Sequence, residues 1–392
     1  MNSPERRALA ALFFIFGFSI IAWIPRLPEI KAHLNLTNGQ FGIIISLGAI
    51  GSILSLLTTG HLVHRYGSHR ALLVSATLLF GSISLIGHMS SVWQFILVNI
   101  AFGAGGSAFN ISVNAEAFHE QESDGANLIP RMYGSWSAGA LSTVILSGFL
   151  AGRVSLAVHL EVVAALGYVM ILILIQKFKD SFMVGSVSVN HSFSIRTPFV
   201  SFHVNWVIAM GLVGAVGLEQ AAGDWITVFS KQELHMGVGI STLPYLLFVV
   251  AVITGRLSVH RFAEYVSIDR LVKLFPIVGG VTFIVCTNLG VLISKSHPMI
   301  GFTLVVAGTF IAGLSLSFLG PTFVDAANRL TNLPGGVVLG QLSLVNTLTI
   351  FFLKAAIAWT AQVASIAVAL IIPSLLLIAA SFASSTIRNA HS

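Results

Sequence analysis

Long apolar stretches alternate with short polar joints along nearly the whole chain. Each stretch is about as long as the roughly 20 residues that a helix needs to cross the hydrocarbon core of a bilayer. The pattern predicts twelve membrane-spanning helices, near residues 8–30, 39–61, 71–89, 92–114, 132–152, 155–176, 202–224, 240–260, 271–293, 299–321, 337–359 and 361–383. The fold class that we expect is an all-α polytopic membrane protein.

The longest polar interruption, KFKDSFMVGSVSVNHSFSIRTP, covers residues 177–198 and divides the spans into two sets of six. We therefore expect an N-terminal six-helix half over 1–176, a central loop over 177–201 and a C-terminal half over 202–392. The halves also echo each other. GHLVHRYG ends the second span and GRLSVHRFAEYV ends the eighth, while Glu116 and Asp325 leave the fourth and tenth spans in matching places. This repeat indicates two pseudo-symmetric halves.

Composition narrows the protein class. The chain is 55% hydrophobic and only 9% charged, whereas soluble domains carry roughly 25% charged residues. The net charge of +6 therefore favours basic loops held against an anionic bilayer surface, and we expect no nucleic-acid partner. The apolar run that begins at Ala8 is not followed by a small-residue cleavage site, so we interpret it as a retained first helix rather than a signal peptide.

The distribution of basic residues predicts the orientation. Of the 20 lysines and arginines, fourteen fall in segments on the same side as the N-terminus and six on the opposite side. Positively charged loops are retained in the cytoplasm. We therefore expect both termini and the central loop to be cytoplasmic, in a cell (inner) membrane.

The joint after the second span, GHLVHRYGSHR (residues 60–70), holds three histidines. His61 and His64 share a helical face and could offer two ligands to a metal. We expect no metal there, because the joint offers no fixed third ligand. Basic anchoring of the loop is the plainer interpretation.

The same stretch resembles the loop signature of the major facilitator superfamily (MFS). The matching residues are Gly60, Leu62, Arg65, Gly67 and Arg70; His64 stands in place of the family's acid, and the second-half copy keeps an acid at Glu264. The segments WIPRLPEIKAHLNLTNGQFG, SVNAEAFHEQ, IPRMYGSWSAG and EQAAGDW are similar to those of the MosC/YbjJ-like branch. The resemblance implies the MFS fold and a transporter, with no enzymatic activity and no cofactor. It also implies that this loop helps to lock the inner gate. Replacement of the acid by His64 is expected to weaken that lock or make it sensitive to pH.

Charged residues at membrane depth are rare here and are candidate functional groups. Arg26 lies near the outer end of the first span, and Glu219 and Asp224 lie toward the outer end of the seventh. The resemblance implies that these two helices meet at an outer gate, so we expect Arg26 to pair with Glu219 or Asp224. Glu219 is also the proton-carrier candidate, because it lies in an apolar run where burial favours the neutral carboxyl. The alternative for all three is an interfacial cap.

Other polar side chains are candidates for a substrate cavity or an inner gate. Asn110 and Asn114 are spaced i, i+4 on one helical face, which suits hydrogen bonding to a polar solute or to a neighbouring helix. Further cavity candidates are Tyr133, Trp136, Tyr245, Gln341 and Asn346. For the inner gate we expect Glu116 to pair with Arg65 or Arg131, and Asp325 with Arg261 or Arg329.

The hypothesis that unites these features is a monomeric secondary active transporter that moves a small solute by alternating access, coupled to protons. Few charges and several asparagines favour a neutral polar solute, such as a sugar derivative. Efflux of amphipathic compounds and a non-transporting sensor that retains the fold are the alternatives. A membrane enzyme would need a convergent catalytic set at membrane depth, and the sequence presents none. No Gly-x-x-x-x-Gly-Lys loop is present to bind a nucleotide.

Overall fold

The computed structural model describes residues 4–124, 128–179, 182–183, 202, 204–331 and 335–391. All regular structure in these ranges is helical. The first elements are α1 (Pro4–Ile21), η1 (Ile24–Arg26), α2 (Leu27–His33), α3 (Asn38–Tyr66), α4 (Ser68–Ile86), α5 (Val92–Asp124), α6 (Ile129–Leu150) and α7 (Leu156–Lys177). They are followed by α9 (Trp206–Gln232), η3 (Ile240–Thr242), α10 (Leu243–Ala263), α11 (Ile268–Ser294), α12 (Pro298–Leu316), α13 (Leu319–Arg329), α14 (Gly335–Val363), α15 (Ile366–Ala369), α16 (Ile371–Ala379), η4 (Ala380–Ala383) and α17 (Ser384–His391).

Eleven segments of the described chain are long and apolar enough to cross a membrane. Helix α6 is not among them, although it has 22 residues. Its sequence is rich in Gly and Ser, which lowers its mean hydropathy while allowing close packing against α1. With α6, the helices correspond one by one to the twelve predicted spans.

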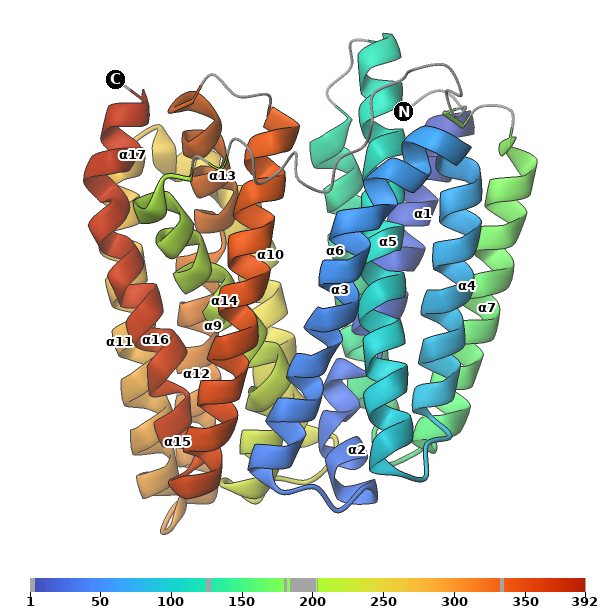
Figure 1. The fold of residues 1–392 in the computed structure, drawn as a ribbon. Coiled ribbons are helices and arrows are strands. Elements are labelled where there is room, and N and C mark those ends of the chain that lie inside the picture. The colour runs from blue at the N-terminus through green and yellow to red at the C-terminus, as the bar shows by residue number, and fades with distance from the viewer. Residues whose placement is uncertain are drawn as a thin grey trace. The chain divides into compact units, whose positions relative to one another are not determined.

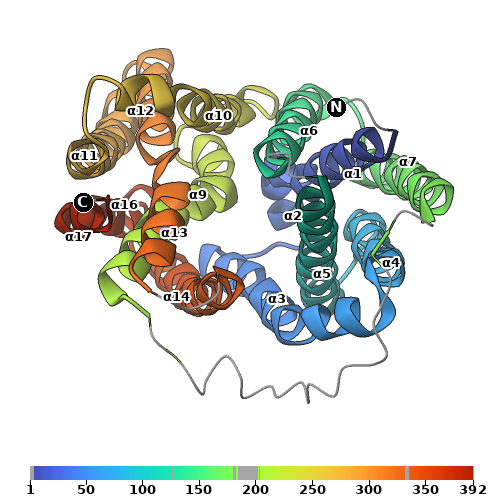
Figure 2. The same cartoon turned by 90° about the horizontal axis from the view of Figure 1, so that it is seen from above.

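The chain divides into two compact units (Figures 1 and 2). One contains residues 1–29 and 47–197, and the other contains residues 30–46 and 198–392. The sequence division assigned residues 30–46 to the first half, whereas their contacts group them with the second. Below, the end of each unit that carries the chain terminus is called the terminal end, and the opposite end is called the distal end.

Small residues set the helix contacts of the first unit. α1 packs against α6, where a Cβ on Gly17 would lie 2.2 Å from the carbonyl oxygen of Trp136. α4 packs against both α5 and α7. α3 meets α5 through Ser52, whose hydroxyl donates to the carbonyl oxygen of Gly103 (3.1 Å), and through Ser55, whose hydroxyl donates to that of Ala104 (2.8 Å). Backbones that approach this closely bring polar groups together inside an apolar bundle.

The second unit repeats these pairings. α9 packs against α14, as α1 does against α6, and α11 packs against α12 and α16, as α4 does against α5 and α7. α10 meets α12 at Gly255, where a Cβ would lie 2.1 Å from the hydroxyl oxygen of Ser317. The same helix pairs therefore recur in the two units, as the sequence repeat predicted.

Helix boundaries differ from the hydropathy prediction at several places. α3 continues to Tyr66, five residues beyond the predicted span, and α9 continues to Gln232, eight residues beyond it. α1 stops at Ile21 and is followed by the short turn η1, which begins at Ile24 and has Pro25 as its second residue. A proline at that place fits the break, because it cannot donate a backbone hydrogen bond to the preceding turn.

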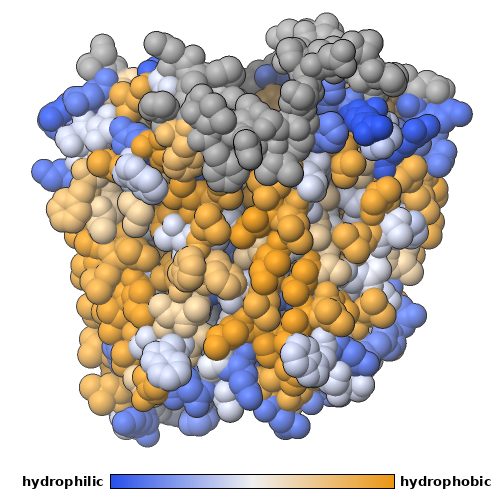
Figure 3. Space-filling model, in the orientation of Figure 1, coloured by the Kyte–Doolittle hydropathy of each residue, from blue (hydrophilic) through white to orange (hydrophobic). Residues whose placement is uncertain are grey.

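The surface has the distribution expected for a bilayer. On the face shown in Figure 3, hydrophobic residues form a broad band at mid-height, and hydrophilic residues gather at the ends. The exposed large apolar side chains include Val74, Leu97, Leu166, Leu257 and Phe352, all on long helices. Side chains of this kind are stable at the surface when lipid is the solvent.

Candidate functional site

Glu219 and Arg256 form an ion pair inside the second unit. Glu219 is the fourteenth of the 27 residues of α9, so it lies at mid-helix. The shorter predicted span had placed it toward the outer end, and that expectation is wrong. Nη2 of Arg256 on α10 lies 3.3 Å and 3.4 Å from the two carboxylate oxygens of Glu219. The side chains are 36% and 34% exposed, so the pair is accessible to a mobile solute or proton.

A second ion pair lies on another side of the same helix. Asp224 Oδ2 lies 2.8 Å from Nζ of Lys354 on α14. Asp224 lies five positions after Glu219, which corresponds to about 140° around a helix. α9 is therefore linked by charge to α10 on one side and to α14 on another. Both pairs lie within apolar helices, where an unpaired charge would be strongly destabilising.

Other polar side chains on α9, α10 and α14 are buried. Tyr245 on α10 is buried and lies within electrostatic range of Glu219 and Asp224. The side-chain oxygens of Thr227 on α9 and Asn346 on α14 are buried and make no hydrogen bond within the part of the chain that the structure describes. Gln341 is buried on the same helix as Asn346. Buried acceptors of this kind need a water or ligand donor to be stable.

Arg26 belongs to a separate buried network in the first unit. Its Nε and Nη2 atoms lie 2.5 Å and 2.6 Å from the two carboxylate oxygens of Glu29, and Nη2 also donates to the carbonyl oxygen of Val154 (2.8 Å). Nη1 lies 3.3 Å from Nδ1 of His159. The guanidinium is fully buried. Its charge is therefore compensated inside the first unit.

The structure thus gives the gate residues partners that differ from the expected ones. We expected Arg26 to pair with Glu219 or Asp224, but it bonds to Glu29. The two acids instead have cationic partners on α10 and α14. The expectation also placed Arg26 and Glu219 at similar depths, whereas Arg26 lies in η1 after the end of α1 and Glu219 lies at mid-helix.

The asparagines on α5 bond to each other. Nδ2 of Asn114 donates to both the side-chain oxygen and the carbonyl oxygen of Asn110 (2.8 Å each). This leaves Nδ2 of Asn110 and Oδ1 of Asn114 unused by the pair, one donor and one acceptor on adjacent turns. On α6, Tyr133 is exposed and its ring lies 5.9 Å from that of Phe13, while Trp136 is half-buried.

The loop signature is mostly helical. Gly60, His64 and Arg65 lie in the last turns of α3, and only Gly67 separates α3 from α4. This glycine has φ 85°, a conformation that L side chains rarely adopt, which explains the second glycine of the signature. Arg70 and His64 are exposed. The described ranges contain no group of three or more His, Cys, Asp and Glu residues placed to hold a metal.

Glu116 joins three segments at the terminal end of the first unit. Its carboxylate accepts hydrogen bonds from the hydroxyl of Ser68 and from the backbone N–H of Met183 (3.0 Å). Ser68 N–H in turn donates to the carbonyl oxygen of Met183 (3.1 Å). These are the contacts of Glu116 in place of the Arg65 or Arg131 that we expected. They hold the beginning of the central connection against the start of α4.

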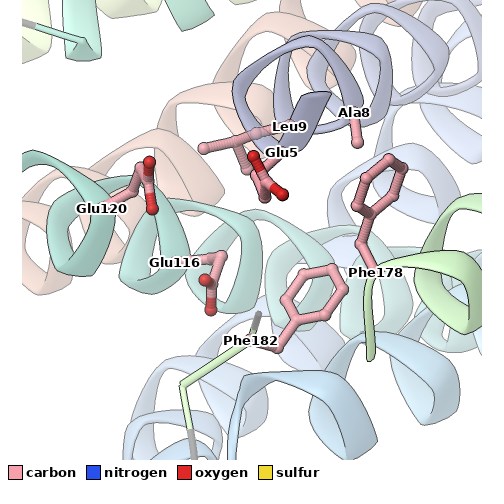
Figure 4. A pocket seen from close by; sticks show the side chains of 7 residues that line it. All are labelled: Glu5, Ala8, Leu9, Glu116, Glu120, Phe178 and Phe182. Atoms are coloured by element: carbon pink, nitrogen blue, oxygen red, sulfur yellow. The ribbon is translucent and has the colours of Figure 1, made fainter. Parts of the chain in front are cut away.

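A small pocket lies beside Glu116 (Figure 4). Glu116 and Glu120 of α5 line one side of it and Phe178 and Phe182 the other, with Glu5 between them. Arg6 bonds to Glu120 across this end of the unit (3.3 Å).

At the terminal end of the second unit, Asp325 bonds to Arg329 one turn later in α13 (2.8 Å), which is one of the two pairings that we expected. Glu264 and Arg261 are exposed at the end of α10. Sequence reasoning missed Arg256 and Lys354 as functional candidates. Both lie inside predicted membrane spans, and a charged side chain at that depth is the signal that could have identified them.

Comparison with known proteins decides the family. A family model described as Major Facilitator Superfamily matches residues 8–354. The chain belongs to the Major Facilitator Superfamily. It is therefore a multi-pass membrane transporter and not an enzyme, as the sequence pattern and the loop signature predicted.

Among MFS relatives, the chain is 24% identical over 373 residues to an uncharacterized MFS-type transporter of Yersinia pestis, covering 93% of this chain and 91% of the relative. It is 22% identical over 331 residues to the membrane protein MosC of Rhizobium meliloti (83% and 76%). These relatives confirm the MosC-like branch. The chain is also 24% identical over 280 residues to the multidrug resistance protein MdtG of Klebsiella pneumoniae (68% and 64%).

Solved MFS structures share the fold. A mutant of the nucleoside transporter NupG superposes with a TM-score of 0.75 at 14% identity, covering 98% of this chain and 99% of that one. A D-xylose-proton symporter superposes with a TM-score of 0.66 at 16% identity (97% and 95%). The twelve-helix MFS architecture that we predicted is confirmed by these likenesses.

Proposed function

We propose that this MFS transporter is a monomeric, proton-coupled carrier of a small, neutral, polar solute, in an inner membrane with both termini in the cytoplasm. Glu219 carries the coupling proton. The observation that supports this assignment is the ion pair between Glu219 and Arg256, about one-third exposed and within two apolar helices. Ionisable groups at this depth are expensive and mark ion pathways.

The geometry indicates how proton binding acts on the helices. Arg256 also donates from Nε to the carbonyl oxygen of Ser317 (3.1 Å), between the end of α12 and the start of α13. A proton on Glu219 removes the negative charge and dissolves the ion pair, while Arg256 keeps its bond to Ser317. α9 is thereby released from α10 on proton binding and held again on proton loss. A proton can shift the equilibrium only through such a difference between the two states.

The solute class follows from polar groups within each of the two units. Thr227 and Asn346 present buried oxygen atoms that need donors, and the Asn110–Asn114 pair offers one donor and one acceptor. Hydroxyl groups of a neutral solute supply both kinds of partner. Because the four charges on α9, α10 and α14 compensate one another, a strongly ionic solute would leave one of them unpaired.

The Glu219→Gln substitution tests the proton assignment. Glutamine mimics the protonated carboxyl, so we expect solute binding and exchange to persist while accumulation driven by a pH gradient falls to a ratio of about one. The measurement is solute uptake and counterflow in proteoliposomes, with the solute taken from a thermal-shift screen of neutral polyols, sugars and nucleosides.

Asp325→Asn is the matched control, because it removes an acid from an exposed ion pair in α13 and should leave accumulation unchanged. If Glu219→Gln accumulates solute against its gradient with the wild-type pH profile, the proton assignment is wrong. Loss of counterflow together with uphill transport would identify the pair as structural instead.

Efflux of an amphipathic compound is the second candidate function, which the similarity to MdtG favours. The direction of net movement discriminates the two. Proton-driven accumulation in inside-out vesicles supports export, and accumulation in right-side-out vesicles supports import.

A further inference from the structure

A chain of hydrogen bonds at the distal end of the first unit fixes the protonation state of His159. This residue lies in the first turn of α7 and is 3% exposed. Its Nδ1 atom lies 3.3 Å from Nη1 of Arg26. A guanidinium carries only donors, so Nδ1 must be the acceptor and the imidazole must be neutral. The hydrogen of the ring is therefore on Nε2.

The other side of the ring agrees with this tautomer. Nε2 lies 3.5 Å from Oγ of Ser147 on α6, and the hydroxyl hydrogen of Ser147 is used in a bond to the carbonyl oxygen of Ala22 (2.7 Å). Ser147 can therefore accept from Nε2–H but cannot donate to it. Donors and acceptors run in one direction from Arg26 through His159 and Ser147 to Ala22, joining η1, α7, α6 and the end of α1.

We infer that the neutral ring of His159 is a pH-sensitive latch, which holds Arg26 to α7 and releases it when the ring is protonated. A proton on Nδ1 places an N–H donor of His159 opposite an N–H donor of Arg26, with the two positively charged groups 3.3 Å apart. The contact cannot survive this change. Arg26 then keeps its bonds to Glu29 and Val154, while α7 loses its side-chain link to η1.

The surrounding charges do not offset this effect. Glu29, on α2, is the carboxylate in contact with Arg26, and both of its oxygens are already occupied by that guanidinium. Glu161, two residues after His159, bonds to His88 on the exposed side of α7 (3.2 Å). Arg153 donates to the carbonyl oxygen of Phe149. On α6, the residue that faces the ring is the neutral Ser147.

The first test reads the ring directly. In detergent-purified protein labelled with ¹⁵N-histidine, at about pH 7.5, the resonance absent from His159→Gln should be that of a neutral ring with its hydrogen on Nε2. A hydrogen on Nδ1, or a charged ring, overturns the inference. If His159→Gln does not fold, Ser147→Ala assigns the same resonance, because it removes the acceptor of Nε2–H.

The second test measures how strongly the folded protein keeps the ring neutral under conditions in which the unfolded chain takes up a proton. Between about pH 7.5 and pH 5.5, wild-type protein should lose roughly 2 °C or more of Tm that His159→Gln does not lose, since glutamine keeps one acceptor and one donor but cannot become charged. His88→Gln is the matched control and should follow the wild-type curve. Equal pH dependence in His159→Gln and wild type overturns the inference.

The experiments distinguish failure of this inference from failure of the proposed function. Loss of the pH effect in His159→Gln together with normal uphill transport in Glu219→Gln supports the His159 site and contradicts the Glu219 assignment. The reverse pattern contradicts His159 alone.

Discussion

Single glycines decide how closely the helices of the first unit approach. A Cβ on Gly51 of α3 would lie 1.9 Å from the carbonyl oxygen of Ile100, and one on Gly103 of α5 would lie 2.0 Å from that of Gly48. Both obstacles are backbone atoms, which cannot rotate away as a side chain can. Helices α3 and α5 must therefore separate if either glycine gains a side chain.

We predict that Gly103→Ala lowers the free energy of unfolding by about 1–3 kcal/mol, because it overpacks a backbone contact. The measurement is Tm in detergent by intrinsic fluorescence. Gly81→Ala is the control: Gly81 lies in α4 with nothing within 4 Å of the added Cβ, so helix propensity predicts equal or higher stability. Equal Tm values for wild type and Gly103→Ala would show that the helices adjust freely.

At this scale, sequence reasoning found the local ion pair between Asp325 and Arg329, because i, i+4 spacing alone brings the two together. It did not find the pair of Glu219 with Arg256, which lie 37 residues apart. Arg26 had an acid available three residues later, at Glu29, but was expected to pair with distant carboxylates. Tertiary packing determines which of several oppositely charged residues becomes the partner, and a single sequence does not show that packing.

At the scale of elements, a residue that follows another helix caps the start of the last membrane segment. Glu233, which follows α9, accepts hydrogen bonds from the backbone N–H groups of Ile366 and Ala367 (3.3 Å for Ala367) at the start of α15. Ser365 accepts from Val368 N–H in the same turn. These groups satisfy N–H donors that have no partner inside the helix.

Burial raises the pKa of Glu233, and the two backbone hydrogen bonds only partly oppose it. A carboxyl with a raised pKa adds stability below the pKa of the unfolded chain and loses it as pH rises through the folded value. We therefore predict that Glu233→Gln flattens the fall of stability as pH rises above about 4, the ordinary pKa of a glutamate. Glu233→Ala should flatten the curve in the same way and, in addition, lower stability relative to Glu233→Gln by about 1–2 kcal/mol, since it leaves the two backbone N–H groups without an acceptor oxygen. Thermal unfolding as a function of pH checks both.

Hydropathy predicted the long apolar spans but not where their helices end. His61, His64 and Arg65 are polar, yet α3 continues through them to Tyr66. Hydropathy reports which residues suit hydrocarbon, whereas a helix ends where its hydrogen bonds end, here at the positive φ of Gly67. The same difference explains why Glu219 was placed too near the end of its helix.

At the scale of the whole molecule, the twelve-helix MFS fold could be predicted because lipid permits few alternatives to helices for an apolar chain of this length. Orientation remains a prediction from charge. Ser188, which lies outside the described residues, should be cytoplasmic with the rest of the central loop.

In a Cys286→Ser background, we expect Ser188→Cys in intact cells to resist an impermeant maleimide and to react after the cells are permeabilised. Ser296→Cys, between α11 and α12, is the counterpart and should react in intact cells. Labelling of Ser188→Cys before permeabilisation would reverse the predicted topology.

The buried position of Arg26 has a consequence for synthesis. Two of its partners, Val154 and His159, lie 128 and 133 residues later in the chain. At about 5–20 residues per second, the ribosome makes them roughly 6–27 s after it has made Arg26. Glu29 follows within one turn and needs no other helix. It can therefore neutralise the arginine while the first helix waits in the membrane for α6 and α7. Glu29→Gln should accordingly lower the yield of inserted protein more than the stability of the protein that does insert.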